Sequence, residues 1–92
     1  MKRAIRMHVD DNVATTMDDL GSGEAVSVVS TDQETIGIIN VAQPIPFGHK
    51  LAILPIKQGE VVTKYGEVIG VASTYIAPGE HTHIHNVNSA RY

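Results

Sequence analysis

The sequence predicts a mostly β domain with many tight turns and one short helix near its N-terminus. Its apolar residues, 42% of the chain, are mainly Val, Ile and Ala, with three Tyr and one Phe as the aromatic residues. β-branched side chains favour strands, and eight Gly with four Pro favour turns. At 92 residues the chain suits a single domain, residues 1–92.

Alternating and apolar runs predict most of the chain as strands. Residues 4–9 alternate, which places Ile5, Met7 and Val9 on one half-buried face. Residues 32–33 suit a hairpin turn, and the two prolines in residues 44–48 predict a connection rather than a central strand. The remaining strands are expected over residues 26–29, 35–41, 50–54, 61–63, 68–72 and 82–87.

The predicted helix follows the polar cluster of residues 10–12. Val13, Met17 and Leu20 recur at helical spacing, and Gly21 comes next. Helix-capping residues, an apolar stripe and a C-terminal glycine predict about two helical turns. The polar cluster is then explained as a set of helix caps.

A short repeat is visible in the second half of the chain. Residues 56–61 and 76–81 both read as Ile, two residues, Gly-Glu and a further residue. Each copy predicts a strand end, a glycine turn and a new strand. Such turns favour a compact, convoluted β unit over a flat sheet.

Composition restricts the classes of function. A net charge of −3 with no extended Lys/Arg cluster argues against a nucleic-acid-binding role. The absence of cysteine excludes disulfides and thiolate metal ligands. No stretch approaches the ~20 apolar residues of a membrane span, and no signal segment begins the chain, so a cytoplasmic protein with no membrane role is expected.

Three of the five histidines, His81, His83 and His85, stand at alternate positions. In a strand they project from one face, a pattern typical of a metal site or an acid–base site. A rise of ~3.3 Å per residue puts neighbouring members ~6.6 Å apart and the outer pair ~13 Å apart. A straight strand therefore brings two of them to one ion and leaves the third for a proton or a partner. The alternative is a solvated polar face.

Two further groups of residues are candidates. His49 and Lys50 follow the proline-rich connection and suit a carboxylate or phosphate, or else a turn cap with an exposed lysine. Lys64 and Tyr65 precede a glycine turn, where lysine can neutralise a substrate carboxylate and tyrosine can donate a proton. The alternative there is a hairpin with Tyr65 packed at its edge.

Four ordered motifs together carry a family resemblance. They are DNVA from residue 11, GHKLA from residue 48, KYG from residue 64 with IG at residue 69, and GEHTHIHN from residue 79. The set resembles the amino-terminal SAF (antifreeze-like) domain of the altronate/galactarate dehydratase family, and the small subunit of sulfolactate sulfo-lyase is similar. The resemblance covers nearly the whole chain and implies a β-clip fold.

The resemblance implies lyase chemistry on an acidic sugar or a short hydroxy acid. A base removes the proton alpha to a carboxylate, a divalent metal stabilises the enediolate, and water or sulfite leaves the beta carbon. Iron or manganese is the metal that the family implies, with zinc as another imidazole-binding choice. The histidine repeat favours the altronate and sulfolactate branches over the galactarate branch.

Roles for individual residues follow from this resemblance. The expected catalytic residues are His83, His85 and His49, and the expected metal ligands are His81, His83 and His85. Lys50, Lys64 and Tyr65 are expected to bind the substrate.

The resemblance also implies a partner. The family domain is either fused to a large catalytic region or made as a separate small subunit, and the lack of a linker near residue 88 favours the second form. The larger partner is expected to hold most of the site, and a homo-oligomer is left open. Two other hypotheses are kept in addition to the lyase. One is a non-catalytic ligand- or partner-binding module, as SAF units form in sialic acid synthases and in flagellar and pilus assembly proteins. The other is a stand-alone metal-binding β protein.

Overall fold

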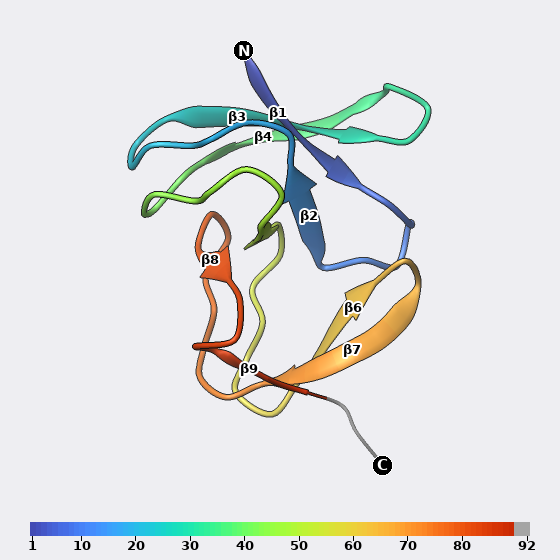
Figure 1. Ribbon diagram of the computed structural model, residues 1–92. Helices are drawn as coiled ribbons and strands as arrows, with labels where there is room; N and C mark the ends of the chain where they lie inside the picture. The colour runs from blue at the N-terminus through green and yellow to red at the C-terminus, as the bar shows by residue number, and fades with distance from the viewer. Residues whose placement is uncertain (90–92) are drawn as a thin grey trace.

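The computed structural model describes residues 1–89, which fold into two β-sheets (Figure 1). The larger sheet has strand order β4-β3-β1-β2-β5-β8 and the smaller one β6-β7-β9. Strands β1 and β3 are parallel, and the other named pairs are antiparallel. The strands are β1 (Lys2–Arg6), β2 (Val13–Thr16), β3 (Ala25–Ser30), β4 (Thr35–Asn40), β5 (Lys50–Ala52), β6 (Val61–Lys64), β7 (Glu67–Ala72), β8 (His81–Thr82) and β9 (Val87–Ser89). The prediction of a mostly β domain is confirmed. Residues 1–89 contain no helix that could span a membrane.

The predicted helix near the N-terminus is wrong. Val13–Thr16 is strand β2, which pairs with β1 on one side and β5 on the other. Val13 and Ala14 are both buried although they face opposite sides, so this segment is apolar on two faces rather than along one helical stripe. Met17, which the helix would have buried, is 39% exposed.

The polar residues assigned as helix caps instead hold the β6–β7 hairpin. The carboxylate of Asp11, which is 2% exposed, accepts backbone N–H groups from His8, Tyr65 and Gly66 at 2.8–3.0 Å. Asn12 Oδ1 accepts the N–H of Thr63, and its Nδ2 donates to the carbonyl of Val61, both at 2.9 Å. These bonds attach the loop between β1 and β2, in the larger sheet, to the β6–β7 hairpin of the smaller sheet.

The first strand also differs from its prediction. It ends at Arg6, and its fully buried side chain is Ala4 rather than Ile5 or Met7. Val9 lies beyond the strand and is 71% exposed. The chain turns away at this point because Asp11 accepts the N–H of His8 and donates its own N–H to the carbonyl of that residue.

Four turns share one backbone pattern, two of which the sequence repeat predicted. Each starts at a buried apolar residue, places a glycine with φ of 81–89° three residues later, and closes with an N–H donated back by the next residue. The four cover residues 20–24, 45–49, 56–60 and 76–80. The apolar residues pair across the fold, Leu20 with Ile45 and Ile56 with Ile76.

In three of these turns the last residue is a glutamate that stabilises the turn. Glu24, Glu60 and Glu80 each accept the backbone N–H three residues earlier through their side chains. In the fourth turn the equivalent N–H belongs to Pro46, which has none. A glutamate at position 49 would therefore have no backbone N–H to accept. Position 49 is a histidine instead, and its side chain is not used to stabilise the turn.

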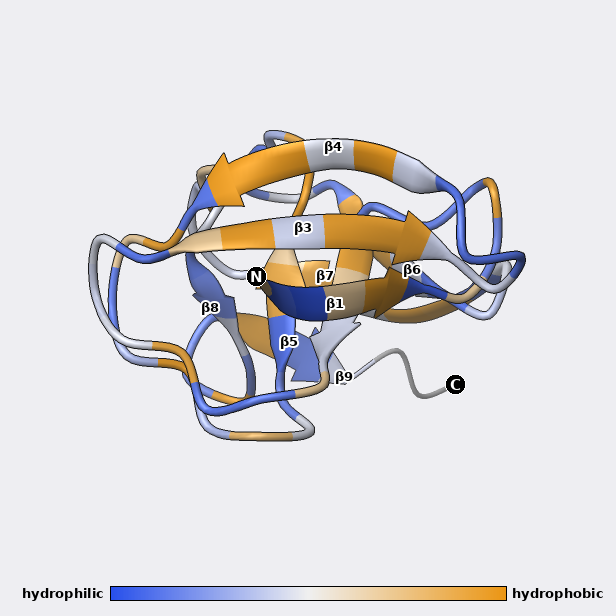
Figure 2. Cartoon of the chain, turned by 90° about the horizontal axis from the view of Figure 1, so that it is seen from above, coloured by the Kyte–Doolittle hydropathy of each residue, from blue (hydrophilic) through white to orange (hydrophobic). Residues whose placement is uncertain are grey.

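The buried side chains form two clusters on either side of β2 and β5. One contains Leu20 and Ile45 and lies against β1 and β3; the other contains Ile56 and Ile76 and lies against β6 and β7. Alternate residues of the two central strands enter different clusters, Ala14 and Leu51 one, Val13 and Ala52 the other. Figure 2 shows the largely apolar β3 and β4 side by side at one edge of the larger sheet, next to β1.

Candidate functional site

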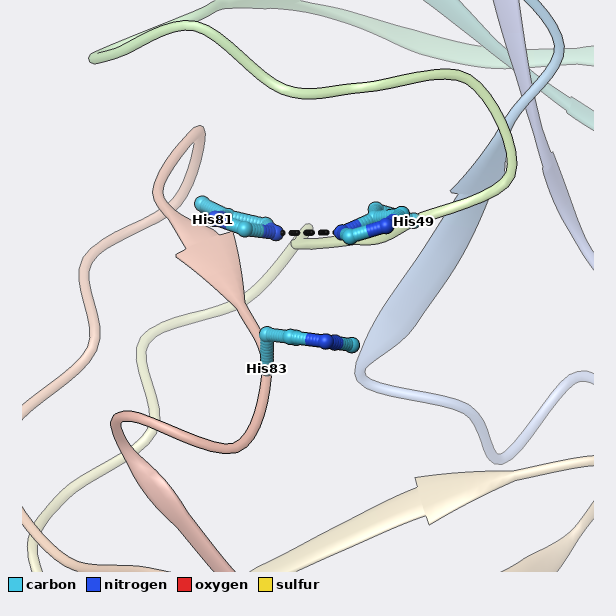
Figure 3. Close-up of side chains that lie close together, drawn as sticks. All are labelled: His49, His81 and His83. Carbon is cyan, nitrogen blue, oxygen red and sulfur yellow. Dashed lines mark hydrogen bonds between the residues drawn. The ribbon is translucent and has the colours of Figure 1, made fainter.

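Three histidines from two segments meet beside strand β8 (Figure 3). His49 Nδ1 and His81 Nε2 lie 2.9 Å apart, so one ring donates a hydrogen bond to the other. The ring of His83 stacks on that of His49, with centroids 4.4 Å apart, and lies 5.4 Å from that of His81. One nitrogen from each ring lies within 4.8 Å of the others.

Strand pairing explains why residues so distant in sequence meet. His49 immediately precedes β5, and β8 pairs with β5 so that His81 stands opposite Leu51. His49 and His81 therefore extend from the same side of adjacent strands. The backbone N–H of His81 is held further by Gln43 Oε1 at 2.8 Å.

The chain does not continue straight after His81. Strand β8 ends at Thr82, a turn covers residues 83–86, and β9 begins at Val87, so the strand predicted over residues 82–87 is not formed. The side chain of Asn86 sets this turn: its Oδ1 accepts the N–H of His83 at 2.9 Å and its Nδ2 donates to the carbonyl of His81 at 2.8 Å.

The turn distributes the three predicted tail histidines unequally. His81 and His83 join His49, whereas the ring of His85 lies 5.2 Å from that of His81, outside the three-nitrogen group. The geometry thus assembles a histidine trio that differs by one member from the set 81, 83 and 85. His49 enters through the sheet, not through the tail.

The surroundings lower the pKa of two of the histidines, His81 and His83. Partial burial, followed by the positive charges that His85, His49, His83 and Lys50 can carry, lowers the pKa of His81 to about 4. Burial is also the largest cause that lowers the pKa of His83, ahead of His49 and Lys50. Neutral imidazoles are the form that binds a metal ion.

Lysines make the site electropositive. The pKa of Lys50 is lowered, first by burial and then by the nearby ammonium of Lys64. Lys50 and His83 line a shallow cavity of about 190 Å³ together with the mostly apolar side chains of Ile69, Ile84, Val87 and Ser89. A cavity with a cation at its edge and few carboxylates nearby suits an anionic ligand.

The other predicted substrate-binding residues, Lys64 and Tyr65, lie on the β6–β7 hairpin. Tyr65 occupies the β6–β7 turn with φ of 57°, donates its N–H to Asp11 and has the ammonium of Lys64 5.2 Å from its ring centre. His8 packs against Gly66 at the same turn and accepts the N–H of Asp10. Neither belongs to the histidine trio.

Two residues of the site were missed by sequence reasoning. Gln43 acts on His81 from 38 positions away, and nothing in the local sequence indicates this contact. Asn86 follows the histidine repeat directly, and the preference of asparagine for turns was a usable signal.

The donor set fits a divalent metal ion. Three imidazole nitrogens within 4.8 Å of one another approach the spacing of about 3.4 Å that tetrahedral ligands ~2.1 Å from an ion require. Zinc, iron and manganese all accept imidazole. Three protein ligands leave a position for a substrate atom, as catalytic sites do.

Comparisons with known proteins agree on one family. The family model described as the altronate/galactarate dehydratase SAF domain matches residues 2–90. Altronate dehydratase of Bacillus subtilis is 37% identical over 89 residues, which cover 97% of this chain and 17% of that protein. Altronate dehydratase of Escherichia coli is 41% identical over 85 residues, or 92% of this chain and 16% of that protein.

A shorter relative matches over nearly its full length. The (2R)-sulfolactate sulfo-lyase subunit alpha of Chromohalobacter salexigens is 36% identical over 84 residues, 90% of this chain and 89% of that subunit. The chain therefore spans about one-sixth of the altronate dehydratases and most of the sulfo-lyase subunit.

Proposed function

Because the chain belongs to the altronate/galactarate dehydratase SAF domain family, we propose that it is the small subunit or N-terminal domain of a metal-dependent lyase acting on a sugar acid such as altronate. The reaction is a β-elimination of water that needs a larger catalytic chain or domain. The arrangement of two sheets linked by four related turns supports the β-clip classification of this family.

The meeting of His49, His81 and His83 is the observation that carries the proposal. Their three nitrogens would hold a divalent ion, with iron or manganese as the family expectation and zinc as the alternative. Such an ion would draw electron density from a substrate carboxylate and make the proton next to it more acidic. His85, beside His81 but outside the trio, would accept or return a proton.

The lysines support an acidic substrate. Lys50 borders the cavity next to His83, and Lys64 lies close enough to lower its pKa. Two ammonium groups beside the imidazoles attract a carboxylate even without a bound metal ion. A substrate-binding role for Tyr65 rests on the approach of its ring to Lys64.

The composition of the site supports a shared active centre. In the part of the chain that the structure describes, the group of possible metal ligands contains three histidines and no carboxylate. Ile84, between two site histidines, is 84% exposed. A larger chain would supply the missing acidic groups and cover this apolar side chain.

Reconstitution with the larger lyase chain tests the proposal. We expect His49→Ala, His83→Ala and His85→Ala each to lower kcat by at least about 100-fold, the scale of losing an acid–base group or a metal ligand. His8→Ala is the matched control, because His8 lies away from the trio, at the β6–β7 turn. Undiminished turnover in all three site variants would refute the proposal.

Sulfolactate sulfo-lyase is the second candidate. A relative named as its subunit alpha is matched over 89% of its own length. The elimination would then release sulfite rather than water. Assaying the reconstituted protein with altronate and with (2R)-sulfolactate, and measuring sulfite, separates the two reactions.

A further inference from the structure

Asn86 makes an unusual pair of contacts for a side chain that takes no part in the proposed chemistry. It is 5% exposed, and its carboxamide binds the backbone of two site histidines at once. Its Oδ1 accepts the N–H of His83 at 2.9 Å, and its Nδ2 donates to the carbonyl of His81 at 2.8 Å. Its own N–H donates to the carbonyl of His83 at 3.1 Å.

These bonds satisfy backbone groups of His81 and His83 at the end of β8, the outermost strand of the larger sheet. An extended chain would place the side chain of His83 about 6.6 Å further along β8 from that of His81. Because Lys50 pairs with Thr82 in an antiparallel register, this next position along β8 lies opposite His49, and the ring of His83 stacks on that of His49 at 4.4 Å. The bonds of Asn86 hold the backbone of His83 at this position, where the chain leaves the strand.

We infer that Asn86 is the positioning residue of the histidine site: its carboxamide holds the backbone of His81 and His83 where the pairing with β5 places it, and so keeps the ring of His83 against that of His49. The role in metal binding rests on the proposed function, whereas the role in placing His83 does not. Residues that orient metal ligands from behind typically change affinity by about 10–100-fold when removed.

The chain contains a matched control. Asn12 also makes one accepted and one donated bond to backbone, with Thr63 and Val61, at 2.9 Å each. It stabilises the β6 strand and touches no histidine of the trio. Asn86→Ala and Asn12→Ala therefore remove the same chemical group and the same number of bonds from two different places.

The first measurement uses metal-free protein. Nuclear Overhauser contacts between the ring protons of His49 and His83 are expected in the unaltered protein and in Asn12→Ala, and are expected to be lost in Asn86→Ala. Circular dichroism reports whether each variant is folded. If Asn86→Ala fails to fold, Asn86→Ser makes the same comparison, because a hydroxyl is polar but too short to reach both backbone groups.

The second measurement is titration with Co²⁺, followed by its visible absorption. Asn86→Ala is expected to weaken Co²⁺ binding at least tenfold, and Asn12→Ala less than threefold. Ring contacts that persist in folded Asn86→Ala, or that are lost equally in Asn12→Ala, would overturn the inference. Failure of the unaltered protein to bind Co²⁺ would overturn the metal site, and the ring contacts alone would then decide the role of Asn86.

Discussion

His81 is the most strongly perturbed residue of the site. It donates its backbone N–H to Gln43, shares a ring hydrogen bond with His49 and offers its carbonyl to Asn86. Partial burial among other basic groups lowers its pKa to about 4, so that its ring is uncharged at neutral pH. These surroundings make protonation of the His81 ring costly to the fold.

Acidification is therefore expected to destabilise the metal-free protein between about pH 6.5 and pH 4. In the unfolded chain His81 binds a proton near its ordinary pKa of 6.5, whereas in the folded chain it does so only near 4. The contribution of His81 to stability is fully present above pH 6.5 and is lost as the pH falls through this window. The lowered pKa of His83 contributes in the same direction. The urea midpoint, measured with a chelator at pH 7 and pH 5, checks this.

His81→Gln is the comparison for the pH experiment. It removes the titrating group, so its midpoint is expected to change less between pH 7 and pH 5 than that of the unaltered protein. Glu24, whose pKa is lowered first by the N–H of Gly21 and then by Lys2, is common to both proteins. Equal pH dependence in the two proteins would contradict the assignment to His81.

Among the elements, the four related turns determine where the strands and the histidines lie. Three use a glutamate to satisfy a backbone N–H, and the fourth, with Pro46, has none to satisfy. That difference frees position 49 for a histidine. A structural repeat with one altered copy thus supplies a residue of the site.

The turn at residues 76–80 is also the most tightly packed, and Gly79→Ala is expected to be severely destabilising. Gly79 has φ of 89°, and a Cβ there would collide with the carbonyl oxygen of Asn40. Strain and collision together should cost about 3–5 kcal/mol. Chemical denaturation measures the change.

Gly59→Ala isolates the contribution of the collision. Gly59 occupies the equivalent turn position with φ of 87°, but a Cβ there would meet nothing within 4 Å. Only the left-handed strain of about 1–2 kcal/mol is expected. If the two variants were equally destabilised, close packing against Asn40 would not be the cause.

The strands and two of the turns could be predicted because their signals are local. Apolar runs bounded by glycine and proline placed most strands near their observed positions, and the repeat at residues 56–61 and 76–81 marked two real turns. The helix was wrong because Val13, Met17 and Leu20 matched a helical spacing, while burial on both faces of β2 decided the outcome.

The candidate site could be predicted only in part, because only some of its signals are local in the sequence. The tail histidines were found from their alternation, but His49 joins them through the pairing of β5 with β8, 32 residues away in sequence. The turn that diverts His85 depends on hydrogen bonds of Asn86 that no spacing rule describes.

In the whole molecule, the site lies at the boundary between the two sheets. β8 belongs to the larger sheet and β9 to the smaller one, and the turn with His83, Ile84 and His85 joins them (Figure 1). The shallow cavity beside it is lined by residues of both sheets, among them Lys50 and Ile69. A partner that covers this turn would contact both sheets and enclose the histidines at once.

Ile84 is the residue that tests this arrangement. Its side chain is 84% exposed, so a change to serine should leave the free domain folded and its Co²⁺ affinity unaltered. Burying an isoleucine contributes about 1.5–3 kcal/mol, and Ile84→Ser is therefore expected to weaken association with the larger lyase chain by about 10–100-fold. Isothermal titration calorimetry measures this directly.

Ile38→Ser provides the control, because Ile38 is 61% exposed on β4, at the edge of the larger sheet opposite to β8. If both substitutions weaken the association equally, or if neither weakens it, the partner does not cover the histidine turn.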